Sequence, residues 1–212
     1  MSIKRVTIKS DVDLEAILSE PGRAGGAVIC HPHPLFGGSM YNNVVEALEE
    51  GFELSGLSTL RFNFRGVGES GGTYDEGNGE IKDVIAACTF MRKLIDPDAR
   101  LVLAGYSFGA WVASRAAMHI QGLKDLVLVA YPFSRYEPAE IRKFDKKLYF
   151  VGGSLDDVSP LDRLLSVYRE VQTEKWLKVL PSSHFFSGVE HEIRDFVHQL
   201  FGSTPDTNSR QK

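Results

Sequence analysis

Short apolar runs alternate with amphipathic runs along most of this 212-residue chain, and this alternation restricts the fold more than any other sequence feature. The apolar runs include GAVICH at 26–31, LSTLRFNF at 57–64 and RLVLAGYS at 100–107, with segments of helical periodicity between them. Parallel strands need crossover helices, and strands covered on both faces are apolar throughout. The pattern therefore predicts an α/β fold with a mostly parallel central sheet and helices on both faces.

The N-terminal segment has a different pattern. KRVTIKS at 4–10 and VDLEAILSE at 12–20 alternate apolar and polar residues, which predicts an antiparallel hairpin with one solvated face. The chain length suits one domain, and no repeat or linker divides it. We expect a single domain over residues 1–202 and a disordered tail at 203–212, where STPDTNSRQK lacks apolar periodicity.

The charge and the polar termini exclude several classes of partner. The formal net charge of −4 gives too little positive field to follow a phosphate backbone, so we expect no nucleic acid partner. No apolar run is long enough to cross a bilayer, and the N-terminus lacks the apolar stretch of a secretory signal, which predicts a cytoplasmic protein without a membrane partner. Cys30 and Cys88 are expected to be buried, reduced thiols.

A candidate nucleophile lies at a predicted strand-to-helix junction, in Gly105-Tyr106-Ser107-Phe108-Gly109. A serine on such a tight turn needs neighbours without side chains two positions away on each side, because the strand and the helix pack closely there. The N-terminus of the following helix adds partial positive charge and free N–H groups beside the hydroxyl. The turn lifts the hydroxyl above the sheet, and the pattern predicts that Ser107 is a nucleophile rather than a simple helix cap.

A serine nucleophile requires an imidazole base and a carboxylate that orients it. Three of the six histidines lie within helical segments: His119, His191 and His198. His184 instead follows the last predicted strand and precedes the last helix, which places it on the same rim of the sheet as Ser107. We predict that His184 is the base.

The carboxylate is expected in the loop VGGSLDDVSP at 151–160, which leaves another predicted strand. Asp156 and Asp157 are both candidates, and we favour Asp156 as the residue that faces the rim. The chain order Ser107, Asp156, His184 is the order found in one of the three serine triad architectures. A Ser-His-Asp triad is therefore predicted.

Two other motifs have simpler interpretations. His31 and His33 share a strand face but have no third ligand at a suitable spacing, so we expect hydrogen-bonded histidines and no metal. Residues 66–71 match G-x-G-x-x-G, but the next helix begins only near Glu80, whereas a phosphate-binding turn opens a helix directly. We interpret residues 65–72 as a loop that supports the site, with Asp83 as its structural partner.

With these motifs together, the sequence resembles the α/β-hydrolase superfamily, and in particular small bacterial members similar to dienelactone hydrolases that bear HPHPLFGGSM, here at 31–40. The other matching blocks are LRFNFRGVGESGG at 60–72 and GYSFGA at 105–110. The resemblance extends from about Val6 to Phe201. It implies the α/β-hydrolase fold, an N-terminal antiparallel hairpin and a triad, and Ser in place of Cys sets this chain apart from the dienelactone enzymes.

The resemblance also implies an oxyanion hole formed by the N–H after the nucleophile, here Phe108, and an N–H of the HPHPLFGG loop. Pro32 and Pro34 have no N–H, which leaves His33, Leu35 or Phe36. The alignment of the -x-F-G turn with dienelactone-like enzymes favours Leu35.

Aromatic residues near predicted strand ends are candidates for an apolar acyl pocket, although most of them are expected in the core. The candidates are Phe36, Tyr41, Tyr106, Tyr131, Phe133 and Phe185. Only SRYEPAEIRKFDK, at 134–146, occupies the usual position of a lid, so we expect minimal or no lid and an open mouth.

These features predict a serine hydrolase that cleaves carboxylic esters, with short acyl chains favoured, through an acyl-enzyme. The expected partner is a small-molecule acyl ester, and no metal or organic cofactor is required. The same triad would also serve a thioesterase, an acyltransferase or a peptidase. A binding protein that keeps the fold without turnover is the alternative from a different class.

Overall fold

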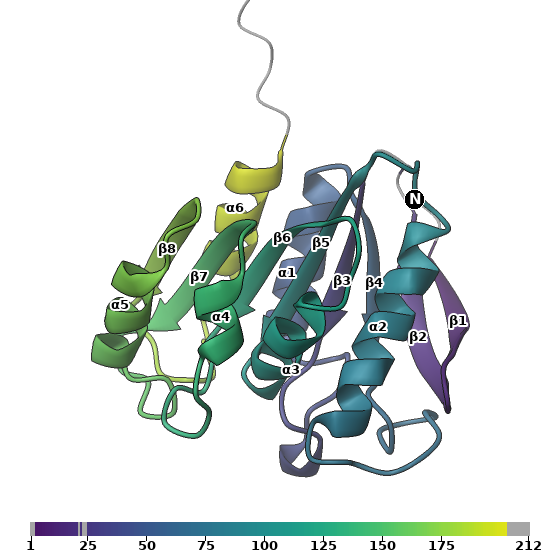
Figure 1. The fold of residues 1–212 in the computed structure, drawn as a ribbon, viewed down its shortest axis with the longest axis horizontal. Helices are drawn as coiled ribbons and strands as arrows, with labels where there is room; N and C mark the ends of the chain where they lie inside the picture. The colour runs from purple at the N-terminus through teal and green to yellow at the C-terminus, as the bar shows by residue number, and fades with distance from the viewer. Residues whose placement is uncertain (1–2, 21, 23–24, 203–212) are drawn as a thin grey trace, which may run out of the picture.

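The computed structural model describes residues 3–20, 22 and 25–202, which form an eight-stranded sheet between two layers of helices (Figure 1). The strands are β1 (Ile3–Lys9), β2 (Asp13–Ser19), β3 (Gly25–Cys30), β4 (Ser58–Phe62), β5 (Arg100–Tyr106), β6 (Leu123–Val129), β7 (Lys147–Gly153) and β8 (Lys175–Leu180). The helices are α1 (Asn43–Leu54), α2 (Asn78–Arg92), α3 (Phe108–Ala117), α4 (Ala139–Lys143), α5 (Leu161–Glu170) and α6 (Glu190–Phe201), with a short 3₁₀ helix at Pro34–Phe36. The predicted disordered tail at 203–212 lies outside the described residues.

The strand order confirms the predicted sheet. The strands lie in the order β1-β2-β4-β3-β5-β6-β7-β8. β1 pairs with β2 and β2 with β4 in antiparallel register, while every later pair is parallel. The N-terminal hairpin is therefore an edge added to a parallel sheet, and the carboxyl ends of β3 to β8 share one rim, where ligands bind in sheets of this type.

Two apolar clusters hold helices against the two faces of the sheet, as the alternating pattern predicts. Val45, Leu48 and Phe52 of α1 pack with Ile193 and Val197 of α6 over one face. Residues of α2, α3 and α5 pack over the other face, and Figure 1 shows these two layers on opposite sides of the strands. The continuous apolar character of the central strands follows from this double coverage.

The connection between β6 and β7 is short, as predicted. Only the five-residue helix α4 forms between them, and its Ile141 is buried in the core. The described residues contain no lid-like addition at this position. The same residues contain no helix of the length and apolarity that a membrane crossing requires.

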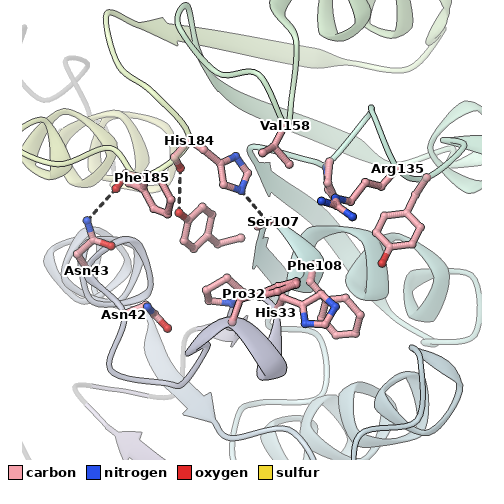
Figure 2. Close-up of a pocket in the computed structure, with 14 residues that line it drawn as sticks. Pro32, His33, Asn42, Asn43, Ser107, Phe108, Arg135, Val158, His184 and Phe185 are labelled. Carbon is pink, nitrogen blue, oxygen red and sulfur yellow. Dashed lines mark hydrogen bonds between the residues drawn. The ribbon is translucent and has the colours of Figure 1, made fainter.

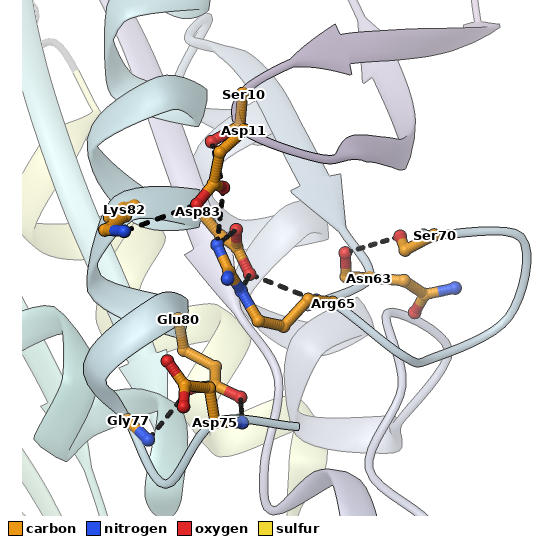
Figure 3. Close-up of polar contacts among 10 residues, drawn as sticks. All are labelled: Ser10, Asp11, Asn63, Arg65, Ser70, Asp75, Gly77, Glu80, Lys82 and Asp83. Atoms are coloured by element: carbon orange, nitrogen blue, oxygen red, sulfur yellow. Dashed lines mark hydrogen bonds and ion pairs between the residues drawn. The ribbon is translucent and has the colours of Figure 1, made fainter. Parts of the chain in front are cut away.

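A buried ion pair anchors the start of the glycine-rich loop predicted at 65–72 (Figure 3). Arg65 donates to both carboxylate oxygens of Asp83 on α2, at 3.1 Å from Nε and 2.7 Å from Nη2, and its backbone N–H donates to the same carboxylate at 3.0 Å. Asp83 is fully buried. Glu80 accepts N–H bonds from Asp75 and Gly77, which caps α2. The structure thus confirms Asp83 as the structural partner of this loop.

The two cysteines also lie where the sequence predicts. Cys30 on β3 and Cys88 on α2 are buried free thiols, and burial raises the pKa of both. A raised thiol pKa suppresses the reactive thiolate, so both residues act as small apolar core residues.

The Arg65–Asp83 pair generates a stability prediction. Asp83→Asn leaves the guanidinium of Arg65 without its buried counter-charge, and we expect a loss of about 3 kcal/mol in the free energy of unfolding. Urea denaturation followed by circular dichroism measures this loss. Asp98→Asn, at an exposed aspartate, is the matched control and should change stability by less than about 0.5 kcal/mol. Equal stability of the two variants would contradict a structural role for the pair.

Candidate active site

Ser107 lies on a sharp turn between β5 and α3, in a backbone conformation that L-residues rarely adopt. Its φ is 55° and its ψ is −118°. A Cβ at position 105 would collide with the backbone of Gly109, and one at position 109 would collide with the carbonyls of Cys30 and His31. Both positions therefore require glycine, because the backbones pack too closely there to leave room for a side chain. This close packing explains the G-x-S-x-G spacing.

The structure brings together the three residues that the sequence predicts as a triad. Ser107 Oγ lies 2.8 Å from His184 Nε2 (Figure 2). His184 Nδ1 lies 2.8 Å from Asp156 Oδ2. The other carboxylate oxygen of Asp156 accepts the backbone N–H groups of Val158 and Ser159 at 2.9 and 2.8 Å. In the tautomer that satisfies both ring contacts, His184 carries its proton on Nδ1 and accepts the Ser107 hydroxyl at Nε2.

The two neighbouring aspartates face in different directions. Asp156 is buried behind the ring of His184, while Asp157 is exposed. The backbone carbonyl of Asp157 accepts a hydrogen bond from Ser134. The geometry therefore supports the preference for Asp156 as the residue that orients the imidazole.

The loop that carries His184 is held by two side chains from other elements. The hydroxyl of Tyr106, buried on β5, donates to the backbone carbonyl of His184 at 2.8 Å. Asn43, at the start of α1, donates to the carbonyl of Phe185 at 3.0 Å (Figure 2). It also donates to the carboxylate of Glu190 at 2.8 Å. These contacts restrict the imidazole to the orientation that meets Ser107.

Near Ser107, the backbone N–H groups of Phe108 and His33 have no acceptor among the described residues. Phe108 is the first residue of α3, so its N–H has no partner within the helix. In the loop after β3, the N–H of Leu35 donates to His33 Nδ1 at 3.2 Å, and that of Phe36 donates to the carbonyl of His33. The backbone N–H of His33 is left without an acceptor.

This arrangement argues against Leu35 as an oxyanion donor. Its N–H is already bonded, its side chain is exposed, and it does not line the cavity beside Ser107, whereas His33 does. The alignment that favours Leu35 rests on the turn sequence alone and cannot show the local hydrogen bond from Leu35 to the side chain of His33.

His31 fixes the start of the same loop. Its Nε2 accepts the backbone N–H of Phe64 at 3.0 Å, and its Nδ1 lies 2.6 Å from the carbonyl of Pro32. The ring is fully buried, and burial lowers its pKa to about 3. His31 is therefore a neutral, doubly hydrogen-bonded residue, in agreement with the prediction of a structural histidine.

His33 is also neutral and lies among aromatic rings. Its Nδ1 accepts from Leu35, and its Nε2 lies 3.3 Å from the hydroxyl of Tyr74. The ring lies 4.8 Å from that of Phe108 and 4.7 Å from that of Phe36. Partial burial, with a smaller contribution from the charge of Arg135, lowers the pKa of His33.

A cavity of about 250 Å³ opens beside Ser107 and His184. Of the aromatic residues proposed as pocket residues, Phe36, Tyr106 and Phe185 line it, and Phe36 and Phe185 are largely exposed at its mouth. The sequence reasoning missed other lining residues, which come from the loops after β3, β6 and β7 and from the first residue of α1: Asn42, Asn43, Pro132, Arg135, Tyr136 and Val158. Their position after strands on the shared rim is the signal that could have found them.

The other three proposed pocket residues lie elsewhere. Tyr131 and Phe133 are buried in the core on either side of Pro132, and the hydroxyl of Tyr131 donates to the carbonyl of Glu137. Tyr41 is half-exposed and stacks against the guanidinium of Arg61. Strand-end position alone does not distinguish residues that face the cavity from residues that face the core.

Comparisons with known proteins agree with this geometry. The sequence profile of the Alpha/beta hydrolase family matches residues 27–207. A solved alpha-beta serine hydrolase homologue from Coxiella burnetii is 33% identical, with a TM-score of 0.86 over 94% of this chain and 98% of that one. A lid-less a/b serine hydrolase from Xanthomonas campestris is 27% identical, with a TM-score of 0.87 over 97% of this chain and 98% of that one.

A curated relative is an uncharacterised protein from Rickettsia prowazekii. It is 36% identical over 120 residues, which make up 56% of this chain and 48% of the relative. The match therefore spans about half the length of that protein.

The hydroxyl of Tyr106 generates the first prediction from this site. Tyr106→Phe removes the hydrogen bond to the carbonyl of His184, so the imidazole is less firmly held, and an organophosphorus serine probe should label Ser107 roughly tenfold more slowly. Tyr168→Phe is the matched control, because it removes a similar hydroxyl-to-carbonyl bond, to Lys175, far from the site. Equal labelling rates in the two variants would remove the positioning role of Tyr106.

The buried ring of His31 generates a pH prediction. The unfolded chain binds a proton at this residue below pH 6.5, whereas the folded protein resists protonation down to about pH 3. The free energy of unfolding should therefore fall as the pH falls from 6.5 towards 3, by up to about 1.4 kcal/mol per pH unit from this residue. Urea denaturation of the wild type and of His31→Gln across this range measures the difference in slope.

His191→Gln is the control for this experiment, because His191 is exposed. We expect His191→Gln to keep the wild-type slope of the free energy of unfolding against pH. In His31→Gln that slope should be smaller by the contribution of about one proton. Parallel curves for the wild type and His31→Gln would show that His31 does not resist protonation.

Proposed function

The chain belongs to the Alpha/beta hydrolase family, and we propose that it is a serine esterase that hydrolyses small carboxylic esters through an acyl-enzyme. The observation that carries the proposal is the continuous hydrogen-bonded chain from Ser107 through His184 to Asp156, with both links at 2.8 Å, beside a cavity. In such a chain, the imidazole can accept the hydroxyl proton and the carboxylate orients the imidazole, so the serine oxygen can attack a carbonyl carbon.

In the proposed acylation step, Ser107 Oγ bonds to the ester carbonyl carbon while His184 Nε2 takes the hydroxyl proton. Asp156 stabilises the imidazolium that forms. The tetrahedral intermediate then collapses, the bond to the alcohol oxygen breaks, and His184 gives its proton to that oxygen. In deacylation, His184 deprotonates water, which attacks the acyl carbonyl, and Ser107 leaves with the proton as the carboxylic acid is released.

The developing oxyanion needs donors that are already in place. We propose the backbone N–H groups of Phe108 and His33, because neither has an acceptor among the described residues and both residues line the cavity. The buried, neutral ring of His31 supports this role by holding the first turn of the loop. Removal of one donor of this kind costs roughly 2.7–4 kcal/mol of transition-state stabilisation in related chemistry.

The size of the cavity supports small substrates. Its volume of about 250 Å³ is below the roughly 300–1,000 Å³ common for drug-sized ligands. Apolar side chains form much of its wall, among them Phe36, Phe108 and Val158. We therefore propose short acyl groups, and a panel of 4-nitrophenyl esters and thioesters of graded length tests both the length preference and the leaving group.

The catalytic role is tested by comparing neighbouring carboxylates. Asp156→Asn should lower kcat for 4-nitrophenyl acetate by about 10³- to 10⁴-fold, because the imidazole loses its orienting partner. Asp157→Asn is the matched control and should retain activity close to that of the wild type, since Asp157 is exposed. A larger loss in Asp157→Asn would overturn the proposed triad.

A fluorophosphonate probe separates turnover from simple binding. We expect it to label the wild type and not Ser107→Ala, as judged by intact-protein mass spectrometry. Absence of labelling in the folded wild type would support a binding protein that keeps the fold, while labelling with activity only on thioesters would support a thioesterase.

A further inference from the structure

Arg135 lines the cavity, yet its guanidinium has no partner in the described part of the chain. The nearest acidic residue in the same loop is Glu137, which faces Arg142 and Arg163 instead. The backbone of Arg135 is fixed, because the N–H groups of Arg135 and Tyr136 both donate to the carbonyl of Pro132, at 2.9 and 3.1 Å. The backbone of Arg135 is thus held at the cavity, while its exposed side chain carries a cation without a counter-ion among the described residues.

The other residues that line the described cavity provide no counter-charge. No aspartate or glutamate is among them. Asp156 lies behind His184, and its two oxygens are already bonded to the imidazole and to two backbone N–H groups. His33 is neutral, since burial and the charge of Arg135 lower its pKa. Among the residues that line the cavity, Arg135 is therefore the one with a permanent charge.

The position of Arg135 relative to Ser107 gives this charge a direction. Figure 2 shows Arg135 on one side of Ser107, and Asn42 and Asn43 on the other. Because Ser107 and Arg135 line the same cavity, an ester whose carbonyl lies at Ser107 and whose acyl or alcohol part occupies that side of the cavity extends towards the guanidinium. The wall on that side is rigid, because Tyr136 stacks on Trp111 with ring centroids 3.9 Å apart and planes 9° from parallel.

We propose that the substrate is an ester with a second, anionic group, a carboxylate or a phosphate, which pairs with Arg135. A planar guanidinium binds either group through two parallel hydrogen bonds. The inference rests on the proposed esterase function and narrows its substrate class. Neutral short esters are then useful assay compounds that lack one recognition element of the substrate.

Matched ester pairs test this proposal. The alcohol-side pair is 4-acetoxybenzoate and its methyl ester, and the acyl-side pair is mono-4-nitrophenyl adipate and its methyl ester. In at least one pair, Arg135→Gln should lower the ratio of kcat/KM for the anionic ester to that for the neutral ester about tenfold, mainly through KM. 4-Acetoxyphenyl phosphate, compared with 4-acetoxybenzoate, distinguishes a phosphate site from a carboxylate site.

Arg169→Gln is the matched control, because it removes the same charge from the exposed face of α5, away from the cavity. This control should leave the ratio unchanged. Arg135→Lys should recover part of the preference, and added salt should reduce the preference in the wild type. An unchanged ratio in Arg135→Gln for every pair would overturn the proposal and leave the esterase function standing.

A binding experiment separates this inference from the esterase proposal. Ser107→Ala should bind 4-acetoxybenzoate more tightly than the double variant Ser107→Ala/Arg135→Gln, with a difference of about tenfold in Kd by NMR titration. If the wild type fails to react with a fluorophosphonate, the proposed esterase function is wrong. The difference in Kd would still show whether Arg135 binds the anionic group. Equal Kd values of the two variants both for 4-acetoxybenzoate and, in a parallel titration, for mono-4-nitrophenyl adipate would overturn that role.

Discussion

The site depends on a close contact between the start of α3 and the end of β3. Gly105 and Gly109, two positions before and after Ser107, make this contact possible. A Cβ at either position would collide with backbone atoms that cannot move aside. The contact holds Ser107 at a φ of 55°, a conformation that costs free energy and persists only because its surroundings determine it. It also brings the N–H of Phe108 and the loop that begins at His31 to the same side of the hydroxyl.

The remaining parts of the site are held by polar groups that are satisfied before any substrate binds. Asp156 uses one oxygen for the imidazole and the other for its own loop, so the carboxylate is fixed on both sides. Tyr106 belongs to the strand that carries Ser107 and bonds to the loop that carries His184. The nucleophile and the base are thereby positioned by one rigid element, which limits the reorganisation needed during reaction.

The fold and the three candidate triad residues could be predicted from the sequence, because both follow from local patterns. Alternating apolar runs specify a parallel sheet, and its shared rim brings the loops that carry Ser107, Asp156 and His184 together. The orientation of individual side chains could not be predicted in this way. Tyr131 and Pro132 are adjacent, yet one enters the core and the other lines the cavity. The turn sequence favours Leu35 as an oxyanion donor, but a hydrogen bond to the side chain of His33 occupies its N–H.

The short connection between β6 and β7 has a kinetic consequence. Because this segment forms only α4, no closing movement of a cover over Ser107 is available in the described chain to gate entry or exit. On the proposed mechanism, the acyl intermediate would remain accessible to any nucleophile in the medium, and water would compete with alcohols and amines according to their abundance. The choice between substrates would then depend on contacts made in the open cavity. A single charged side chain at its edge would therefore have a large effect on that choice.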